Sequence, residues 1–174
     1  MGTRTAIFQE QSNGQFLGIY IHYDGYIEGV GNTLLDHYGS RKKTFELLNK
    51  KRFLSCLGNT TEFISFEEQM EMYSNNNKDI ENYCVAHNDE EYFLAESLED
   101  IRTMQYLTYC NGEIDGFYAT DEEEGTEFIE FRGSDNNGFL YYQDLNGCWH
   151  VSRSIAKETY HDRMSAFEPL DTLL

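Results

Sequence analysis

Apolar residues gather in two short stretches near the start of the chain, residues 4–9 and 16–23, and a polar segment separates them. Short apolar runs bounded by turn residues are typical of β-strands, whose side chains point alternately to the two faces. Asn13-Gly14 lies between the stretches, and both residues readily adopt the positive φ angles of a tight hairpin turn. The pattern therefore predicts a β-hairpin.

Helical spacing and capping residues predict the next elements. Apolar residues follow Gly29 at helical spacing, and Ser40 can cap a second helix that runs to about residue 49. Residues 66–73 predict a short acidic helix, which a run of asparagines ends. Ser97 and the acids after it begin another helical segment. The segment "RFLSCLGN" between these helices is interpreted as a closing turn.

Strand-like segments dominate the remainder of the chain. They are "YCVAH", "EYFLAE", "DGFYAT", "EFIEFRG", "GFLYYQDL" and "CWHVSR". The last two are joined through Asn146-Gly147, a second hairpin signal. The tail from Ile155 is expected to be mostly irregular. The sequence thus predicts an α+β fold in one domain, residues 1–174, with an antiparallel sheet and about three helices.

Acidic residues are in large excess, and they are unevenly distributed. The chain of 174 residues has a net charge of −18, and 15% of its residues are aromatic, which indicates a packed structure. Residues 1–58 hold seven basic and five acidic side chains, whereas residues 59–174 hold six basic and 26 acidic ones. Such a charge disfavours direct binding of nucleic acid, for which only the basic strip from Arg41 to Arg52 is suited.

Several classes of protein lack their signatures in this chain. No apolar stretch is long enough to span a membrane, and the N-terminus has neither an apolar signal core nor a myristoylation pattern. The four cysteines include no C-x-x-C pair, so we expect reduced thiols and a cytoplasmic location. The histidines form no H-E-x-x-H motif, and no ordered calcium loop is present. We therefore expect no metal, no cofactor and no catalytic residues.

One candidate ligand site lies at the end of the second predicted strand. Tyr20, His22 and Asp24 share one face of that strand if the alternation continues, and His37 follows on the first predicted helix. A carboxylate beside an imidazole can orient a general base or support a bound ligand. Asp-Gly at a strand end is also ordinary turn chemistry, and this interpretation remains open.

The other candidate surface is made of acidic residues between positions 59 and 148. Carboxylates spaced along a surface can resemble DNA phosphates and compete for the basic cleft of a nuclease or repressor. A solvated surface and weak cation binding are the alternatives. The candidate partner-binding residues are Glu67, Glu68, Asp89, Glu90, Glu91, Asp121, Glu122, Glu123, Glu124, Glu127 and Glu130.

Parts of the chain resemble a family of small bacteriophage and prophage proteins. The likeness rests on the N-terminal "MGTRT", on "IYIHYDGYIEGVG" followed by "LLDHY", and on "LSCLGN". It covers about the first 60 residues, with a looser likeness in "YYQDLNGCWHVS". The family's Ser-Leu-Gly turn is altered here, where Cys56 separates Ser55 from Leu57. The resemblance implies phage origin and action in the cytoplasm of a bacterial host.

These observations together predict a phage-encoded acidic binding protein. Its expected partner is a basic host protein such as a nuclease or a CRISPR effector, which it would inhibit in an anti-restriction or anti-CRISPR manner by mimicking nucleic acid. A homodimer is a further expected association. The alternative is a small enzyme or a nucleotide- or metal-binding protein centred on Tyr20, His22, Asp24 and His37.

Overall fold

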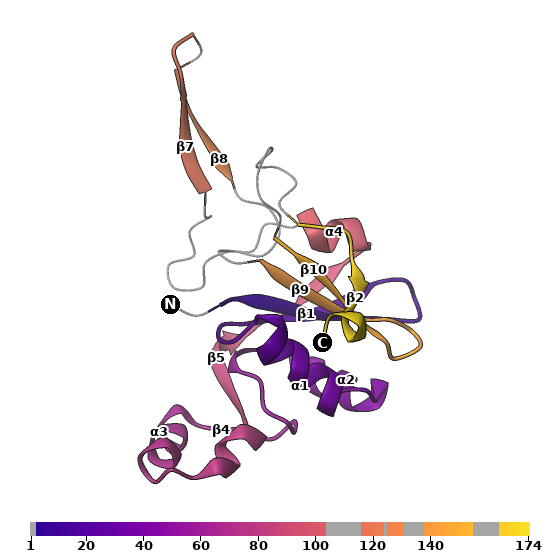
Figure 1. Cartoon of the computed structure of the whole chain (residues 1–174), viewed down its shortest axis with the longest axis vertical. Coiled ribbons are helices and arrows are strands. Elements are labelled where there is room, and N and C mark those ends of the chain that lie inside the picture. Colours follow the sequence, from indigo (N-terminus) through magenta and orange to yellow (C-terminus); the bar gives the residue numbers. More distant parts are fainter. Residues whose placement is uncertain (1–2, 104–115, 124, 131–137, 155–163) are drawn as a thin grey trace.

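A mixed β-sheet runs through the middle of the molecule (Figure 1). The computed structural model describes residues 3–103, 116–123, 125–130, 138–154 and 164–174. Among these residues, nine strands form the main sheet in the order β11-β10-β9-β1-β2-β3-β5-β4, with β6 also paired to β2. Most neighbours are antiparallel, whereas β1 with β9, β2 with β3 and β4 with β5 are parallel. The predicted α+β fold class is confirmed.

The helices and strands have the following bounds. The main sheet contains β1 (Thr5–Glu10), β2 (Phe16–Ile21), β3 (Arg52–Cys56), β4 (Phe63–Ile64), β5 (Cys84–Glu90), β6 (Phe93–Ala95), β9 (Phe139–Gln143), β10 (Trp149–Arg153) and β11 (Glu168–Pro169). A separate hairpin contains β7 (Gly116–Asp121) and β8 (Gly125–Glu130). The α-helices are α1 (Asn32–His37), α2 (Arg41–Leu48), α3 (Phe66–Ser74) and α4 (Leu98–Thr103). A π-helical turn, η1 (Ile27–Gly31), precedes α1, and η2 (Lys78–Asn82) and η3 (Leu170–Leu173) are 3-10 helices.

The β1–β2 hairpin is the centre of the sheet and is buried on both faces. Its turn contains Gly14 at a φ of 87°, as the Asn-Gly pair predicts. In β1, Ile7 packs on one face, with α1 and α2, whereas Phe8 packs on the other, with Ile101 of α4. Figure 1 shows α1 and α2 on one side of the sheet and α4 on the other. Two apolar cores therefore meet at the central strands.

Gly18 lets an aromatic ring lie flat on the central hairpin. It pairs with Phe8 across the β1–β2 ladder. A Cβ atom at position 18 would lie 2.3 Å from Cδ1 of Phe8, well inside van der Waals contact. A larger residue at this position would therefore displace the ring from the core.

Tyr38 ties the sheet to the helices from the end of α1. Its side chain is fully buried, and its backbone oxygen accepts hydrogen bonds from Nε1 of Trp149 at 2.8 Å and Nε2 of Gln143 at 3.1 Å. Its hydroxyl lies 2.8 Å from the backbone oxygen of Gly58 and 3.0 Å from that of Thr60, to which it donates. Tyr38 thus connects β9 and β10 to the turn after β3.

One predicted turn is a strand. The segment "RFLSCLGN" contains β3, which pairs with β5 and joins β2 through Ile21 and Leu54. The prediction was wrong because Phe53 and Leu54 are buried by strands that lie far away in the sequence. None of the helices within the described ranges has the length and apolarity that a bilayer crossing requires.

We expect Tyr38→Phe to destabilise the protein by about 1 to 3 kcal/mol, because the buried carbonyl of Gly58 and the partly buried carbonyl of Thr60 lose their shared donor. Urea denaturation followed by circular dichroism measures this change. Tyr73→Phe is the matched control, because Tyr73 is 59% exposed, and we expect a change below about 0.5 kcal/mol. Equal stability of the two variants would show that the Tyr38 hydroxyl does not support the turn.

Candidate functional site

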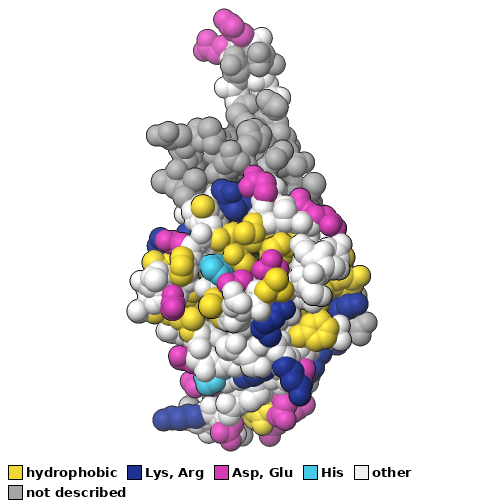
Figure 2. Space-filling view, turned by 90° about the vertical axis from the view of Figure 1, so that its right-hand side faces the viewer, with side chains coloured by type: hydrophobic (Ala, Val, Ile, Leu, Met, Phe, Trp, Pro, Cys, Tyr) yellow, Lys and Arg dark blue, Asp and Glu magenta, His cyan; other side chains and the backbone are white. Residues whose placement is uncertain are grey.

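The predicted acidic residues lie at well-separated places. Glu67 and Glu68 are exposed in the first turn of α3, at one end of the long axis of the molecule (Figure 1). Glu122 and Glu123 are exposed between β7 and β8, and this hairpin projects at the opposite end. Figure 2 shows acidic side chains at both ends and a mixture of acidic and basic ones between them. The described carboxylates therefore do not form one continuous face on the side shown.

For most of the other predicted acids, the structure describes only the strand to which the residue belongs. Glu91 is exposed between β5 and β6. Asp89 and Glu90 belong to β5, Asp121 belongs to β7, and Glu127 and Glu130 belong to β8. Glu124 lies outside the described residues.

Tyr20 and His22 form a pair at the end of β2. The Tyr20 hydroxyl and Nδ1 of His22 are 2.9 Å apart. The strand ends at Ile21, and Asp24 adopts a φ of 62°, which breaks the alternation. The prediction that His22 and Asp24 share a strand face is therefore wrong, because a left-handed residue reverses the chain at this corner.

His87 completes the aromatic cluster, and it was missed from the sequence. Its imidazole stacks on that of His22, with ring centroids 4.8 Å apart and planes 10° from parallel. Burial, which has the largest effect, and the charges of His87 and Arg4 together lower the pKa of His22 to about 4. Burial and the charge of Arg4 also lower the pKa of His87. Both imidazole rings are consequently neutral near pH 7. They stack on each other and lie beside the ring of Tyr20.

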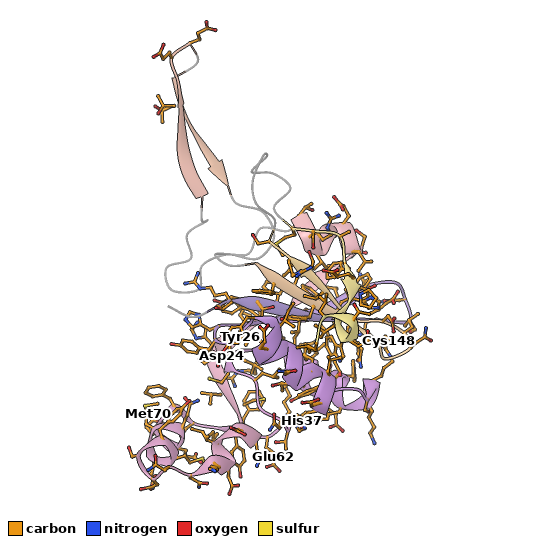
Figure 3. The ribbon with its side chains drawn as sticks, viewed as in Figure 1. Asp24, Tyr26, His37, Glu62, Met70 and Cys148 are labelled. Atoms are coloured by element: carbon orange, nitrogen blue, oxygen red, sulfur yellow. The ribbon has the colours of Figure 1, made fainter. Side chains whose placement is uncertain are left out.

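Asp24 and His37, by contrast, line a cavity of about 280 Å³ beside α1. Glu28 and Asp36 line the same cavity, and Tyr26 donates a hydrogen bond to Asp24 at 3.3 Å. Figure 3 shows Asp24 and Tyr26 close together at the η1 end and His37 farther along α1. The structure thus divides the predicted ligand site into the Tyr20–His22 pair and this cavity.

A second cavity, of about 260 Å³, continues the first toward α3. The two share part of their lining, including Asp24, Cys56 and Asn59, and the second adds Tyr73 and Glu81. We call the two together the acidic groove. Its lining carries four exposed carboxylates and no Lys or Arg among the described residues; the acids are Asp24, Glu28, Asp36 and Glu81.

Three cations of the basic strip, Arg41, Lys43 and Lys50, contact other parts of the protein. Arg41 donates to the backbone oxygens of Glu10 and Asp144, at 2.7 and 2.6 Å, and so holds two hairpin turns together. Lys43 donates to the backbone oxygen of Asn59 and lies 4.4 Å from the centre of the Tyr38 ring. Lys50 contacts the loop after β3 in the same way: it donates to the backbone oxygen of Thr61 and lies over the Phe63 ring. These side chains stabilise the fold.

Asp144, Cys148 and His150 lie at a third cavity, of about 370 Å³. Nε2 of His150 is 2.9 Å from Oδ2 of Asp144, and Oδ1 accepts from the backbone N–H groups of Asn146 and Cys148. Burial alone would raise the pKa of Asp144, but these hydrogen bonds outweigh it and hold the pKa below its usual value. Asp144 therefore stabilises the turn between β9 and β10 through its hydrogen bonds.

The described residues offer no group of three or more His, Cys, Asp and Glu side chains suited to a metal ion. Comparison with family models, with curated proteins and with solved structures found no significant match. The residues themselves are therefore the basis for any functional conclusion.

Acidification should destabilise the protein through His22 and His87. Both pKa values lie below the 6.5 of an unfolded histidine, so the unfolded chain binds more protons and stability is lost from about pH 6.5 down to about pH 4. We expect His22→Gln/His87→Gln to reduce the fall in the urea midpoint between about pH 7 and about pH 5. His37→Gln, at an exposed histidine, should keep the full decrease. A double variant with the original pH dependence would contradict this assignment.

Proposed function

We propose that the protein is an acidic binding protein that engages a basic, nucleic-acid-acting complex of a bacterial host and inhibits it. The observation that carries this proposal is the acidic groove, where four carboxylates are exposed and no cation lines the cavities among the described residues. Proteins that bind nucleic acids have basic clefts by necessity, and such clefts attract carboxylates.

The net charge of −18 supports the same class of partner. The partners that the structure gives Arg41, Lys43 and Lys50 are backbone oxygens and aromatic rings, not carboxylates. The negative field would raise the association rate with a cationic protein and repel nucleic acid itself. The resemblance to phage proteins in the first 60 residues suggests restriction enzymes and CRISPR effectors as the host complexes.

The mode of inhibition follows from the separation of the acids. Helix α3, which carries Glu67, and the β7–β8 hairpin, whose turn carries Glu122, lie at opposite ends of the long axis, and Figure 2 shows basic side chains among the acids between the two ends. This arrangement favours contacts with lysines and arginines at distinct points over imitation of a continuous row of phosphates. The acidic groove would hold cationic side chains between carboxylates and the rings of Tyr23 and Tyr26.

Purified restriction endonucleases and a Cas9-type effector test the proposal in a DNA cleavage assay. We expect inhibition that weakens as salt rises from about 50 to about 300 mM, because exposed charges are screened. Glu28→Gln/Asp36→Asn should raise the half-inhibitory concentration about three- to tenfold, since two carboxylates of the groove are lost.

Glu46→Gln/Asp171→Asn is the matched control, because it removes the same charge at exposed positions outside the groove. We expect it to inhibit nearly as well as the original chain. An equal loss of inhibition in both double variants would show that inhibition depends on the net charge and not on the acidic groove. Inhibition that does not change with salt would contradict recognition by charge.

A further inference from the structure

Helix α3 exposes its apolar residues and buries a polar one. Phe66, Met70 and Tyr73 are 62%, 40% and 59% exposed, whereas Gln69 is 7% exposed. The three apolar residues are spaced by four and three positions, so they form one stripe along the helix. We call Phe66, Met70 and Tyr73 the α3 stripe. An amphipathic helix of a folded protein normally faces its apolar stripe toward the core.

The α3 stripe is not needed to form the helix. The Ser65 hydroxyl caps its N-terminus by accepting from the backbone N–H of Glu68, and the same hydroxyl donates back to the Glu68 carboxylate at 3.2 Å. Glu67 and Glu68 also lie in the first turn, where the helix dipole favours negative charge. At the other end, Asn76 adopts a φ of 51°.

The α3 stripe is not what attaches the helix to the sheet either. Nε2 of Gln69 lies 3.4 Å from Sγ of Cys56 in β3, to which it donates. Met72 is half-buried on the same side as Gln69. Phe66, Met70 and Tyr73 are thus exposed, whereas the polar Gln69 makes the contact with β3.

Carboxylates surround the α3 stripe. Glu67 and Glu71 follow Phe66 and Met70 by one position each, so they lie along one flank of the stripe, and both are exposed. Tyr73 belongs to the stripe and also lines the acidic groove together with Glu81. Figure 3 shows Met70 on α3 at the end of the molecule far from Cys148. The result is an apolar surface with an acidic border that continues into the groove.

We propose that the α3 stripe is the docking site for an amphipathic basic segment of a protein partner. Such a segment carries apolar side chains on one face and lysines or arginines at its edges, which match the stripe and its acidic border. A second copy of this chain fits less well, because it would bring Glu67, Glu68 and Glu71 against acids of its own kind. This inference rests on the proposed function and names the surface and the kind of partner segment.

Two fluorescently labelled peptides of about 18 residues and equal positive charge test the proposal in fluorescence anisotropy. One carries leucines at helical spacing between lysines, and the other carries serines in place of those leucines. We expect the leucine peptide to bind about tenfold more tightly, and to keep measurable binding at about 500 mM salt, where exposed charges are screened.

Phe66→Ser/Met70→Ser should lower the affinity for the leucine peptide about tenfold and leave that for the serine peptide unchanged. The matched control is Leu145→Ser/Leu174→Ser, at positions outside α3 that are 51% and 52% exposed, and it should bind both peptides like the original chain. Circular dichroism and the urea midpoint confirm that each variant is folded.

The outcomes separate this inference from the proposed function. Equal binding of the two peptides, or unchanged binding by Phe66→Ser/Met70→Ser, overturns the docking site and leaves an acidic binding protein. Failure of both peptides to bind at low salt contradicts both proposals. Sedimentation equilibrium gives a further test: a dimer that the Phe66→Ser/Met70→Ser substitutions convert to a monomer would assign the stripe to self-association and overturn the docking site.

Discussion

The buried position of Tyr38 is the constraint on which the arrangement of the molecule depends. Its backbone oxygen receives donors from β9 and β10, and its hydroxyl reaches the turn at Gly58 and Thr60. Unpaired polar groups are costly in such surroundings, so these partners must stay together. The turn that Tyr38 holds also supplies Leu57 and Asn59 to the wall of the acidic groove. The same network that packs the core therefore shapes the groove.

Local signals in the sequence predicted the elements whose causes are local. The Asn13-Gly14 turn and the cap Ser40 act within a few residues, and each lies where it was expected. The parallel pairing of β1 with β9 joins residues 134 positions apart, as Thr5 and Phe139 show, and no local pattern specifies it. Strand β3 was wrongly predicted as a turn for the same reason, because its partners β2 and β5 lie far away in the sequence.

The candidate site was harder to predict than the fold, because it depends on side-chain direction at a corner of the chain. The two-residue period predicted that His22 and Asp24 share a strand face, but the strand ends at Ile21 and Asp24 adopts a φ of 62°, so His22 pairs with Tyr20 whereas Asp24 lines the acidic groove. Nothing near His22 indicates that His87 stacks on it, since the contact arises through β3 and β5. The spacing of Phe66, Met70 and Tyr73 indicates one apolar face of a helix, and such a face is normally buried. The exposed fractions of these side chains show that the face is turned to solvent instead.

The large negative charge of the chain bears directly on the exposed α3 stripe, because it opposes self-association through that surface. A bare apolar stripe on a neutral protein promotes self-association, whereas a net charge of −18 opposes it by electrostatic repulsion. The carboxylates beside Phe66 and Met70 act at the shortest range, because a second copy must approach them to cover the stripe. A cationic partner meets attraction from the same groups. The same acids would therefore weaken self-association through the α3 stripe and favour a cationic segment as the partner that we propose for it.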